Sequence, residues 1–478
     1  EAYLNGLYFG NGIYGIKNAA KMFFDKDLKS LNLSECATIA AVVKNPSRFS
    51  PLKNPQNSYE RRNLILRQMK DNNFITEEQE LAARVKKISV SDKKHEETIN
   101  AAYVEGVLDE ASKITGLTTK ELLLSEYKIY TYFDEQEQKI LYGAVTDEAH
   151  LLKNKNGKLP DAMSMIVDNH DGGINAFYIN SYINNIFDLR RQPGSAAKPI
   201  FVYAPAFSEN LITPLTKIDD VKKSFDGYSP SNFKEKYAGR TTVRNLVMQS
   251  SNVSAVEILK MLTVEKSKAF ALTMGIELDK SDGVNIALGG LRRGLTPIEL
   301  ISGYTMLANS GNYKDIGFIK KICDQNGNLI YEKGLSYKSI ISAEDAYIMT
   351  DILKDTAKRG TAKLLSPLTF DTASKTGTVS NNTDKSLNND AWNLSYTTCH
   401  TILCWQGNLS NKTENALSSQ VTGGGYPTLV AKEILSKLYT GFLPADFERP
   451  DGIVDYDGDI LKVSDIMRAK NEDSRIDM

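Results

Sequence analysis

The sequence has few cysteines, almost no net charge and no long apolar run, and each scarcity excludes a class of protein. Four cysteines among 478 residues cannot build a disulfide-based fold. Lys and Arg number 58 against 59 Asp and Glu, so the chain lacks the positive excess of proteins that bind nucleic acid by neutralising phosphates. A membrane helix needs ~18 consecutive apolar residues, and Ala37–Val43, among the longest apolar runs, is far shorter.

Three potential metal ligands, Cys399, His400 and Cys404, stand close together in the sequence. Their spacing is not that of a zinc site. The stretch around them is strand-like, and cysteine in such a stretch behaves as a small hydrophobic residue. We therefore expect no metal here and interpret the cysteines as packing residues.

The length predicts about three domains at ~150 residues each, and the pattern along the chain indicates where they divide. Residues 1–83 have the apolar spacing of helices, and 84–160 form a mixed, strongly charged segment that we interpret as a linker subdomain. Residues 161–440 form the largest unit. The C-terminal tail is 441–478, and its last part, 451–478, is acidic and has few aromatic residues, so we expect this part to be exposed and partly disordered.

The largest unit predicts an α+β fold. It begins with a strand pair, continues with helices and ends with strands, which indicates one antiparallel sheet with helices on its faces. The expected strands are 163–167, 174–179, 317–323, 328–332, 372–379, 391–397 and 400–406, and the expected helices are 195–206, 241–263, 265–275 and 295–310.

Three short motifs follow one another in this unit: Ser195-Ala196-Ala197-Lys198, Ser250-Ser251-Asn252 and Lys375-Thr376-Gly377-Thr378. Ser-x-x-Lys also occurs elsewhere in the chain and is weak alone, whereas Lys-Thr-Gly occurs once. Their order and context together indicate a serine acyl-transfer site. None of the four histidines has a comparable setting, which disfavours a Ser-His-Asp hydrolase.

The chemistry of each motif fits nucleophilic catalysis. Ser195 follows Pro-Gly at a turn into a helix, where free N–H groups and the helix dipole stabilise an oxyanion. Lys198 is one turn further on and acts as a base if burial or a second cation, for which Lys375 is the candidate, lowers its pKa. Ser250 can relay a proton from Lys198 to the leaving amine, and Asn252 can hold the substrate amide or Lys198.

The third motif suits the substrate and the oxyanion. The hydroxyl groups of Thr376 and Thr378, together with Lys375, can bind a substrate carboxylate, and the Thr378 N–H is a candidate second oxyanion donor. Gly377 completes this strand motif.

With these motifs the chain resembles a class A penicillin-binding protein over nearly its whole length. Arg191–Pro199 resembles the active-serine motif, Tyr228–Phe233 the loop before the second motif, Arg244–Val253 the helix that carries that motif, and Asp390-Ala391-Trp392 a late strand of the transpeptidase sheet. The resemblance implies a penicillin-binding/β-lactamase-like transpeptidase fold, with an antiparallel sheet flanked by helices.

The N-terminal part is similar to the end of the family's peptidoglycan glycosyltransferase domain, which has a lysozyme-like helical fold. Glu1 and Asn5 match its fourth motif, and Arg61 and Arg62 its fifth. In the family the catalytic glutamates lie upstream of these motifs. We therefore expect this chain to be a fragment that transfers no glycan, with a membrane anchor upstream of it and a location on the extracytoplasmic face of the bacterial cell membrane.

The resemblance implies a serine D,D-transpeptidase. Its partners would be peptidoglycan stem peptides, lipid II-derived glycan and β-lactams, which acylate Ser195; no cofactor, metal or nucleic acid is implied. One alternative is a D,D-carboxypeptidase or β-lactamase-type hydrolase that uses water as the acceptor. Another is a non-catalytic penicillin-binding sensor or scaffold. The acceptor amine, diaminopimelate or lysine, is left open.

Overall fold

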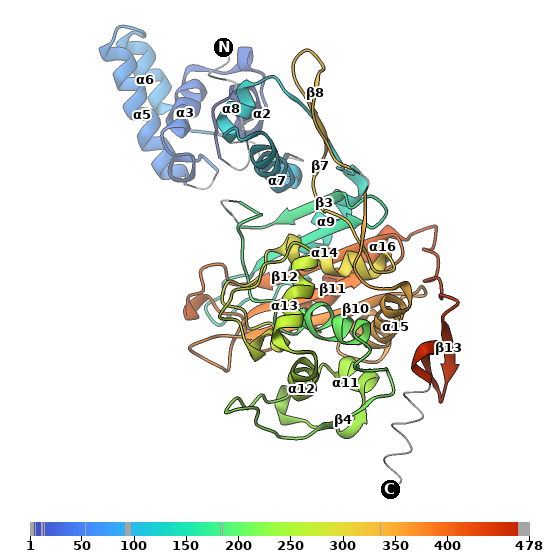
Figure 1. Ribbon diagram of the computed structural model, residues 1–478. Coiled ribbons are helices and arrows are strands. Elements are labelled where there is room, and N and C mark those ends of the chain that lie inside the picture. The colour runs from blue at the N-terminus through green and yellow to red at the C-terminus, as the bar shows by residue number, and fades with distance from the viewer. Residues whose placement is uncertain are drawn as a thin grey trace. The chain divides into compact units, whose positions relative to one another are not determined.

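The computed structural model divides the chain into two compact units (Figure 1). One comprises residues 1–129 and 321–331, and the other 130–320 and 332–478. The described residues are 4, 6–10, 13, 15–52, 54–90, 97–181, 183, 185–334 and 336–466. Within these ranges no helix has the length and apolar character needed to cross a membrane.

The first unit is mostly helical. Its α-helices are α2 (Ile16–Phe24), α3 (Leu33–Val43), α4 (Pro46–Phe49), α5 (Pro55–Asp71), α6 (Glu77–Val85), α7 (Glu97–Thr115) and α8 (Thr119–Leu124). Reciprocal capping boxes begin α3, α6 and α8, and each satisfies two backbone donors that the first turn leaves free. Apolar clusters around Phe23 and Leu66 form its cores. Of the segment 1–83 that was expected to be helical, the expectation is confirmed for 16–83, whereas residues 6–10, 13 and 15 do not belong to a helix.

The second unit is built on a five-stranded antiparallel sheet with strand order β10-β11-β12-β2-β3. Its strands are β2 (Asp161–Asp168), β3 (Ile174–Ile179), β10 (Ala373–Ser380), β11 (Asn388–Tyr396) and β12 (His400–Gly407). The predicted antiparallel sheet is confirmed for the strands expected at 163–167, 174–179, 372–379, 391–397 and 400–406, but the strands expected at 317–323 and 328–332 are not part of it. A separate three-stranded sheet has the order β1-β7-β8, formed by Lys128–Thr131, Ile319–Cys323 and Leu329–Glu332.

Helices cover both faces of the five-stranded sheet. Successive strand residues point to opposite faces, and Ile402 of β12 packs with α9 (Glu135–Thr146) and α16 (Tyr426–Leu438). On the other face Tyr396 of β11 contacts Tyr304 and Thr350. These two residues belong to α14 (Pro297–Ala308) and α15 (Ala343–Lys358). The sheet therefore forms the middle layer of three.

Two segments that were each predicted to form one continuous helix are interrupted in the structure. The expected helix 241–263 is two helices, α11 (Val243–Gln249) and α12 (Asn252–Leu262), because Ser250 adopts a left-handed conformation with φ of 59°. The expected helix 195–206 is a 3₁₀ turn, a π-helical turn and α10 (Ala204–Ser208). The predicted 265–275 corresponds to α13 (Val264–Thr273), and α15 and α16 were not among the predicted helices.

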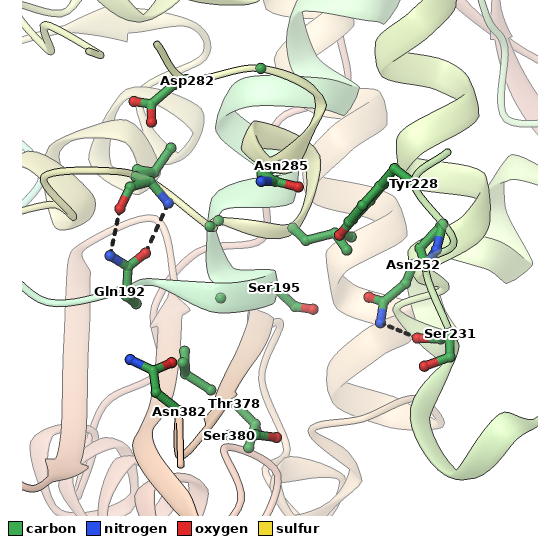
Figure 2. Close-up of a pocket in the computed structure, with 18 of the residues that line it drawn as sticks. Gln192, Ser195, Tyr228, Ser231, Asn252, Asp282, Asn285, Thr378, Ser380 and Asn382 are labelled. Carbon is green, nitrogen blue, oxygen red and sulfur yellow. Dashed lines mark hydrogen bonds between the residues drawn. The ribbon is translucent and has the colours of Figure 1, made fainter. Parts of the chain in front are cut away.

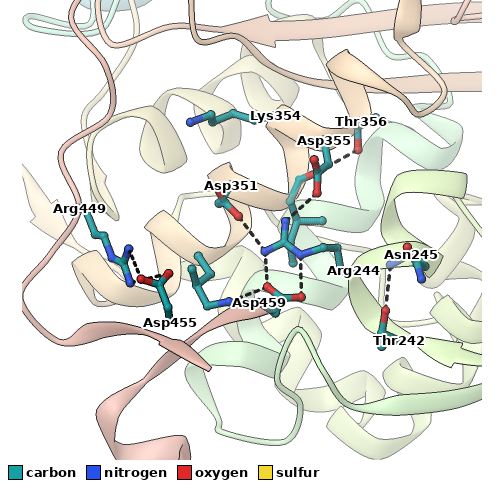
Figure 3. Close-up of polar contacts among 12 residues, drawn as sticks. Thr242, Arg244, Asn245, Asp351, Lys354, Asp355, Thr356, Arg449, Asp455 and Asp459 are labelled. Carbon is teal, nitrogen blue, oxygen red and sulfur yellow. Dashed lines mark hydrogen bonds and ion pairs between the residues drawn. The ribbon is translucent and has the colours of Figure 1, made fainter. Parts of the chain in front are cut away.

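Residues 453–466 of the C-terminal tail are folded, so the expectation of an exposed segment is wrong for this part. A hairpin of β13 (Ile453–Tyr456) and β14 (Asp459–Lys462) buries Leu461 completely. Figure 3 shows Asp459 paired with Arg244, whose guanidinium also binds Asp351 and Asp355. Asp459 is one of the acidic residues that led to the expectation of an exposed tail. Through Arg244 it fixes the hairpin to α11 and α15. Residues 467–478 lie outside the described residues.

Candidate active site

The three sequence motifs meet at an open, largely polar cavity of about 840 Å³ (Figure 2). Ser195, Asn252 and Thr378 line it, one from each motif. Its charged lining residues are Asp282, Arg292 and Lys385. Asp282 accepts hydrogen bonds from the backbone N–H groups of Asp279 and Arg292.

Ser195 lies on the 3₁₀ turn Gly194–Ala197, and Lys198 follows directly. Side chains three residues apart eclipse each other in a 3₁₀ helix, so this local geometry places Ser195 and Lys198 on one side of the turn. Ser195 is half-buried and Lys198 is completely buried. The predicted proximity of serine and lysine on one face therefore arises from a tighter helix than the expected one.

The segment before Ser195 is fixed by contacts on both sides. The Gln192 side chain exchanges two hydrogen bonds with the Leu291 backbone, at 2.6 and 2.9 Å (Figure 2). The Trp392 indole N–H donates to the Gln192 carbonyl at 2.9 Å. Arg191 is buried and donates to Asp390 Oδ1 at 2.7 Å. These contacts hold the turn that carries Ser195 against β11.

The Lys198 amine is held by the second motif. Its Nζ donates to the carbonyl oxygens of Ser250 and Ser251 at 2.8 and 2.9 Å, and to Asn252 Oδ1 at 2.7 Å. The left-handed Ser250 ends α11 and redirects the chain at this point. The predicted contact between Asn252 and Lys198 is present.

Ser250 Oγ lies between two lysine amines. Lys375 Nζ donates to it at 2.8 Å, and Lys198 Nζ is 3.5 Å away. Burial lowers the pKa of Lys375 to about 7. Burial, and then the charge of Lys375, hold the pKa of Lys198 well below its ordinary value, whereas Asp220 opposes this shift. The arrangement therefore favours a neutral lysine that can accept a proton.

The third motif lies against the nucleophile turn because Gly377 has no side chain. A Cβ at Gly377 would lie 2.4 Å from the Pro193 carbonyl oxygen. Thr378 lines the cavity, and its Oγ1 accepts a hydrogen bond from the Gly423 N–H at 3.0 Å. Thr376 donates its hydroxyl to Thr361 Oγ1 at 2.8 Å and is not among the cavity-lining residues.

The remaining predicted residues have other settings. Glu1 and Asn5 lie outside the described residues. Arg62 is fully buried and donates to Ser34 Oγ and to the carbonyl oxygens of Arg84 and Lys86. These bonds tie α5 to the start of α3 and the end of α6.

Arg61 lies over the Phe49 ring, with its guanidinium carbon 5.7 Å from the ring centre. Among the residues that the structure describes, possible metal-ligand atoms converge at Asp147, His150 and Glu433 only, and not at Cys399, His400 and Cys404.

Sequence reasoning missed Asp220, a completely buried carboxylate behind the second motif. Nothing in the sequence distinguishes it from the other acidic residues of the chain. Asn232, its hydrogen-bond partner, falls within the loop Tyr228–Phe233 that the motif comparison singled out, but no role was assigned to it.

Comparisons with known proteins agree with this geometry. Residues 1–70 match the family described as transglycosylase, and residues 140–434 match the penicillin binding protein transpeptidase domain. Penicillin-binding protein 1F of Bacillus subtilis (strain 168) is 31% identical over 443 residues, which cover 91% of this chain and 61% of that protein. The chain spans about three-fifths of the length of the curated relatives it matches first.

Solved structures share the fold. Penicillin-binding protein 1A from Haemophilus influenzae superposes with a TM-score of 0.60 at 20% identity, covering 95% of this chain and 86% of that one. The PonA1 protein from Mycobacterium tuberculosis in complex with penicillin V gives a TM-score of 0.61 at 21% identity, covering 73% of this chain and 96% of that one.

Proposed function

The chain belongs to the penicillin-binding protein transpeptidase family, and from this premise we propose that it is a serine D,D-transpeptidase that cross-links peptidoglycan stem peptides. The observation that carries the proposal is the convergence of Lys198, Ser250 and Lys375 behind a half-buried serine. The buried amines of Lys375 and Lys198 lie 2.8 and 3.5 Å from Ser250 Oγ. Lysines on a protein surface would not be buried in this way.

In the first half-reaction Ser195 Oγ attacks the carbonyl of the D-Ala-D-Ala peptide bond. Lys198, as a neutral amine, takes the Oγ proton, and Ser250 passes a proton to the leaving D-Ala nitrogen. The backbone N–H groups of Ser195 and Thr378 stabilise the oxyanion. The C–N bond breaks, free D-Ala leaves, and an ester to Ser195 remains.

In the second half-reaction an amine of a neighbouring stem attacks this ester. The amine proton returns through Ser250 and Lys198 to Ser195 Oγ, and a new amide cross-link forms. Lys375 and Thr378 hold the donor carboxylate. Thr376 lies between them in the sequence of β10, and Gly377 allows β10 to approach the turn that carries Ser195. Under the proposal β-lactams acylate the same oxygen, and the complex of the PonA1 protein with penicillin V supports this.

We extend the proposal to the longer protein of which this chain matches a part. The transglycosylase match supports a second, glycan-polymerising role for that protein. In this chain, residues 1–83 would be the end of its glycosyltransferase domain and 84–160 a linker. Residues 161–440 would be the transpeptidase domain and 441–478 a tail. Its substrates, stem peptides and lipid II-derived glycan, place it outside the cytoplasmic membrane.

Labelling with a fluorescent penicillin tests the proposal. We expect a stable band on a denaturing gel for the native chain and no band for Ser195→Ala. Ser229→Ala, which alters another serine of the same cavity, is the matched control and keeps the band. Absence of labelling in the native, folded chain would refute the serine acyl-enzyme.

Release of D-Ala from a pentapeptide then separates an enzyme from a penicillin-binding sensor. Product analysis with an added amine acceptor separates the transpeptidase from a hydrolase, because a hydrolase transfers the acyl group to water.

A further inference from the structure

A buried carboxylate stands behind the second motif. Asp220 ends β4 (Lys217–Asp220), which pairs with β5 (Gly239–Thr242), and its exposed fraction is 1%. Within the described part of the chain no cation lies within ion-pair distance of it, whereas its exposed neighbour Asp219 pairs with Arg240. A buried charge without a cation needs several hydrogen bonds to be tolerated.

Three donors satisfy this carboxylate. Asn232 Nδ2 and Ser251 Oγ each donate to Asp220 Oδ1 at 2.7 Å, and the Ala238 N–H donates to Oδ2 at 2.8 Å. An ionised carboxylate can only accept hydrogen bonds. It therefore fixes which end of the Asn232 amide faces it, and the amide oxygen must point the other way.

That oxygen points at the first turn of α12. Asn232 Oδ1 accepts from the backbone N–H groups of Asn252 and Val253, at 2.8 and 3.2 Å. Ser251, the second partner of Asp220, caps the same helix by accepting from the Ser254 N–H at 3.2 Å. A helix start leaves its first N–H groups without partners inside the helix, so one carboxylate orients both side chains that satisfy them.

The first residue of this turn is Asn252, which contacts the catalytic lysine. Its Oδ1 accepts from Lys198 Nζ at 2.7 Å, and its Nδ2 donates to the Ser231 carbonyl at 2.7 Å (Figure 2). The Ser251 carbonyl also accepts from Lys198. Asp220, Asn232 and the neighbouring Ser231 therefore all hold the segment 251–253 by hydrogen bonds.

We propose that Asp220 is a positioning residue of the acyl-transfer site, which acts through Asn232 and Ser251 to set the start of α12 and so to present Asn252 to Lys198. The inference rests on the proposed function, because it assigns a role within that reaction. Asp220 touches neither of the reacting atoms; it determines where the base is held.

The charge of Asp220 predicts an effect on the pH dependence of acylation, which a purely steric role of Asp220 would not produce. The groups that act on Lys198 are Lys375 on β10, which lowers its pKa, and Asp220, which raises it; Tyr203 is a third titratable group near Asp220. Removing the carboxylate charge therefore favours the neutral amine. The pH at which Lys198 becomes a competent base then falls.

The test is the second-order rate constant for acylation by a fluorescent penicillin, measured from pH 5 to pH 9 on the full chain. For Asp220→Asn we expect the plateau to fall at least about tenfold, because the base is misplaced. The acid limb should move to lower pH, because the carboxylate that raises the pKa of Lys198 has lost its charge. Asp219→Asn, the same charge change on the exposed side of the same strand, should match the native profile.

A folded Asp220→Asn protein with the native plateau and limb would overturn the inference. If thermal unfolding shows that this variant does not fold, the same rate measurement on Asn232→Ser tests the inference. It keeps the carboxylate but cannot bridge it to α12, so we expect a lower plateau with an unmoved acid limb, and a native plateau overturns the inference. Failure of the native chain to label would instead refute the proposed function itself.

Discussion

The burial of the single residue Lys375 lowers the stability of the folded protein. Its side chain is completely buried, and its amine donates to Ser250 Oγ and to the Thr376 carbonyl. Neither acceptor carries a charge, so burial disfavours the ammonium form and the pKa falls to about 7. Under the proposed function, the reaction needs a neutral amine at Lys198 and a charge at Lys375, and burial of the two amines lowers the folding free energy that is available.

This pKa predicts a pH dependence of stability. The unfolded lysine has a pKa of about 10.4, so between pH ~7 and ~10 the unfolded chain binds a proton that the folded protein has released. The free energy of unfolding must then rise with pH over this range through Lys375. Lys375→Met should remove that contribution, and urea unfolding of both proteins at pH 7 and pH 10 measures it.

The control for this comparison is Lys385→Met, which alters an exposed lysine at the same cavity. It should retain the native pH dependence. Equal slopes for the native protein and Lys375→Met would show that the folded Lys375 keeps an ordinary pKa.

At the scale of elements, the second motif depends on a helix break. The apolar pattern of 241–263 is continuous enough to predict one helix, yet Ser250 at φ 59° ends α11 and Ser251 caps α12. A continuous helix would keep the Ser250 and Ser251 carbonyl oxygens in intrahelical bonds. The break releases them for Lys198, so the departure from the sequence pattern falls at the functional site.

The C-terminal hairpin is the second element with a testable role. Asp459 of β14 has a side chain only 6% exposed and binds the guanidinium of Arg244, a residue in the first turn of α11 (Figure 3). Asp459→Asn should lower the free energy of unfolding by about 1–3 kcal/mol, because one charge-assisted contact is lost in a buried place. Chemical denaturation measures the change.

Asp457→Asn is the matched control, since Asp457 is exposed at the turn of the same hairpin. It should leave stability within about 0.5 kcal/mol of native. An equal loss in both variants would show that the hairpin responds to its net charge and not to the Arg244 contact.

At the scale of the whole molecule, each unit has its own apolar core. We therefore expect two transitions in scanning calorimetry. Penicillin reacts with the second unit alone under the proposed function, and binding to the folded state stabilises it. One transition should move to higher temperature after acylation while the other stays. Ser195→Ala should show neither shift, and a parallel shift of both transitions would show that the units unfold together.

The sequence by itself determined the family and the fold class of this protein. The order of Ser195, Lys198, Ser250, Asn252 and Lys375, with strands before and after a helical middle, was sufficient, because the family's motifs are short runs of particular side chains and secondary structure follows local patterns. The contact of Asn252 with Lys198 and the approach of Lys375 to Ser250 follow from that assignment.

Only the tertiary structure decided which polar residues are buried and what they hold. Arg62, assigned by motif to a glycosyltransferase, joins three helices of its unit. Asp459, in a tail expected to be disordered, fixes a hairpin. Asp220 binds Asn232 and Ser251 next to the contacts of Lys198. Burial and long-range hydrogen bonds depend on residues far apart in the chain, so no local pattern distinguishes such side chains from solvated ones.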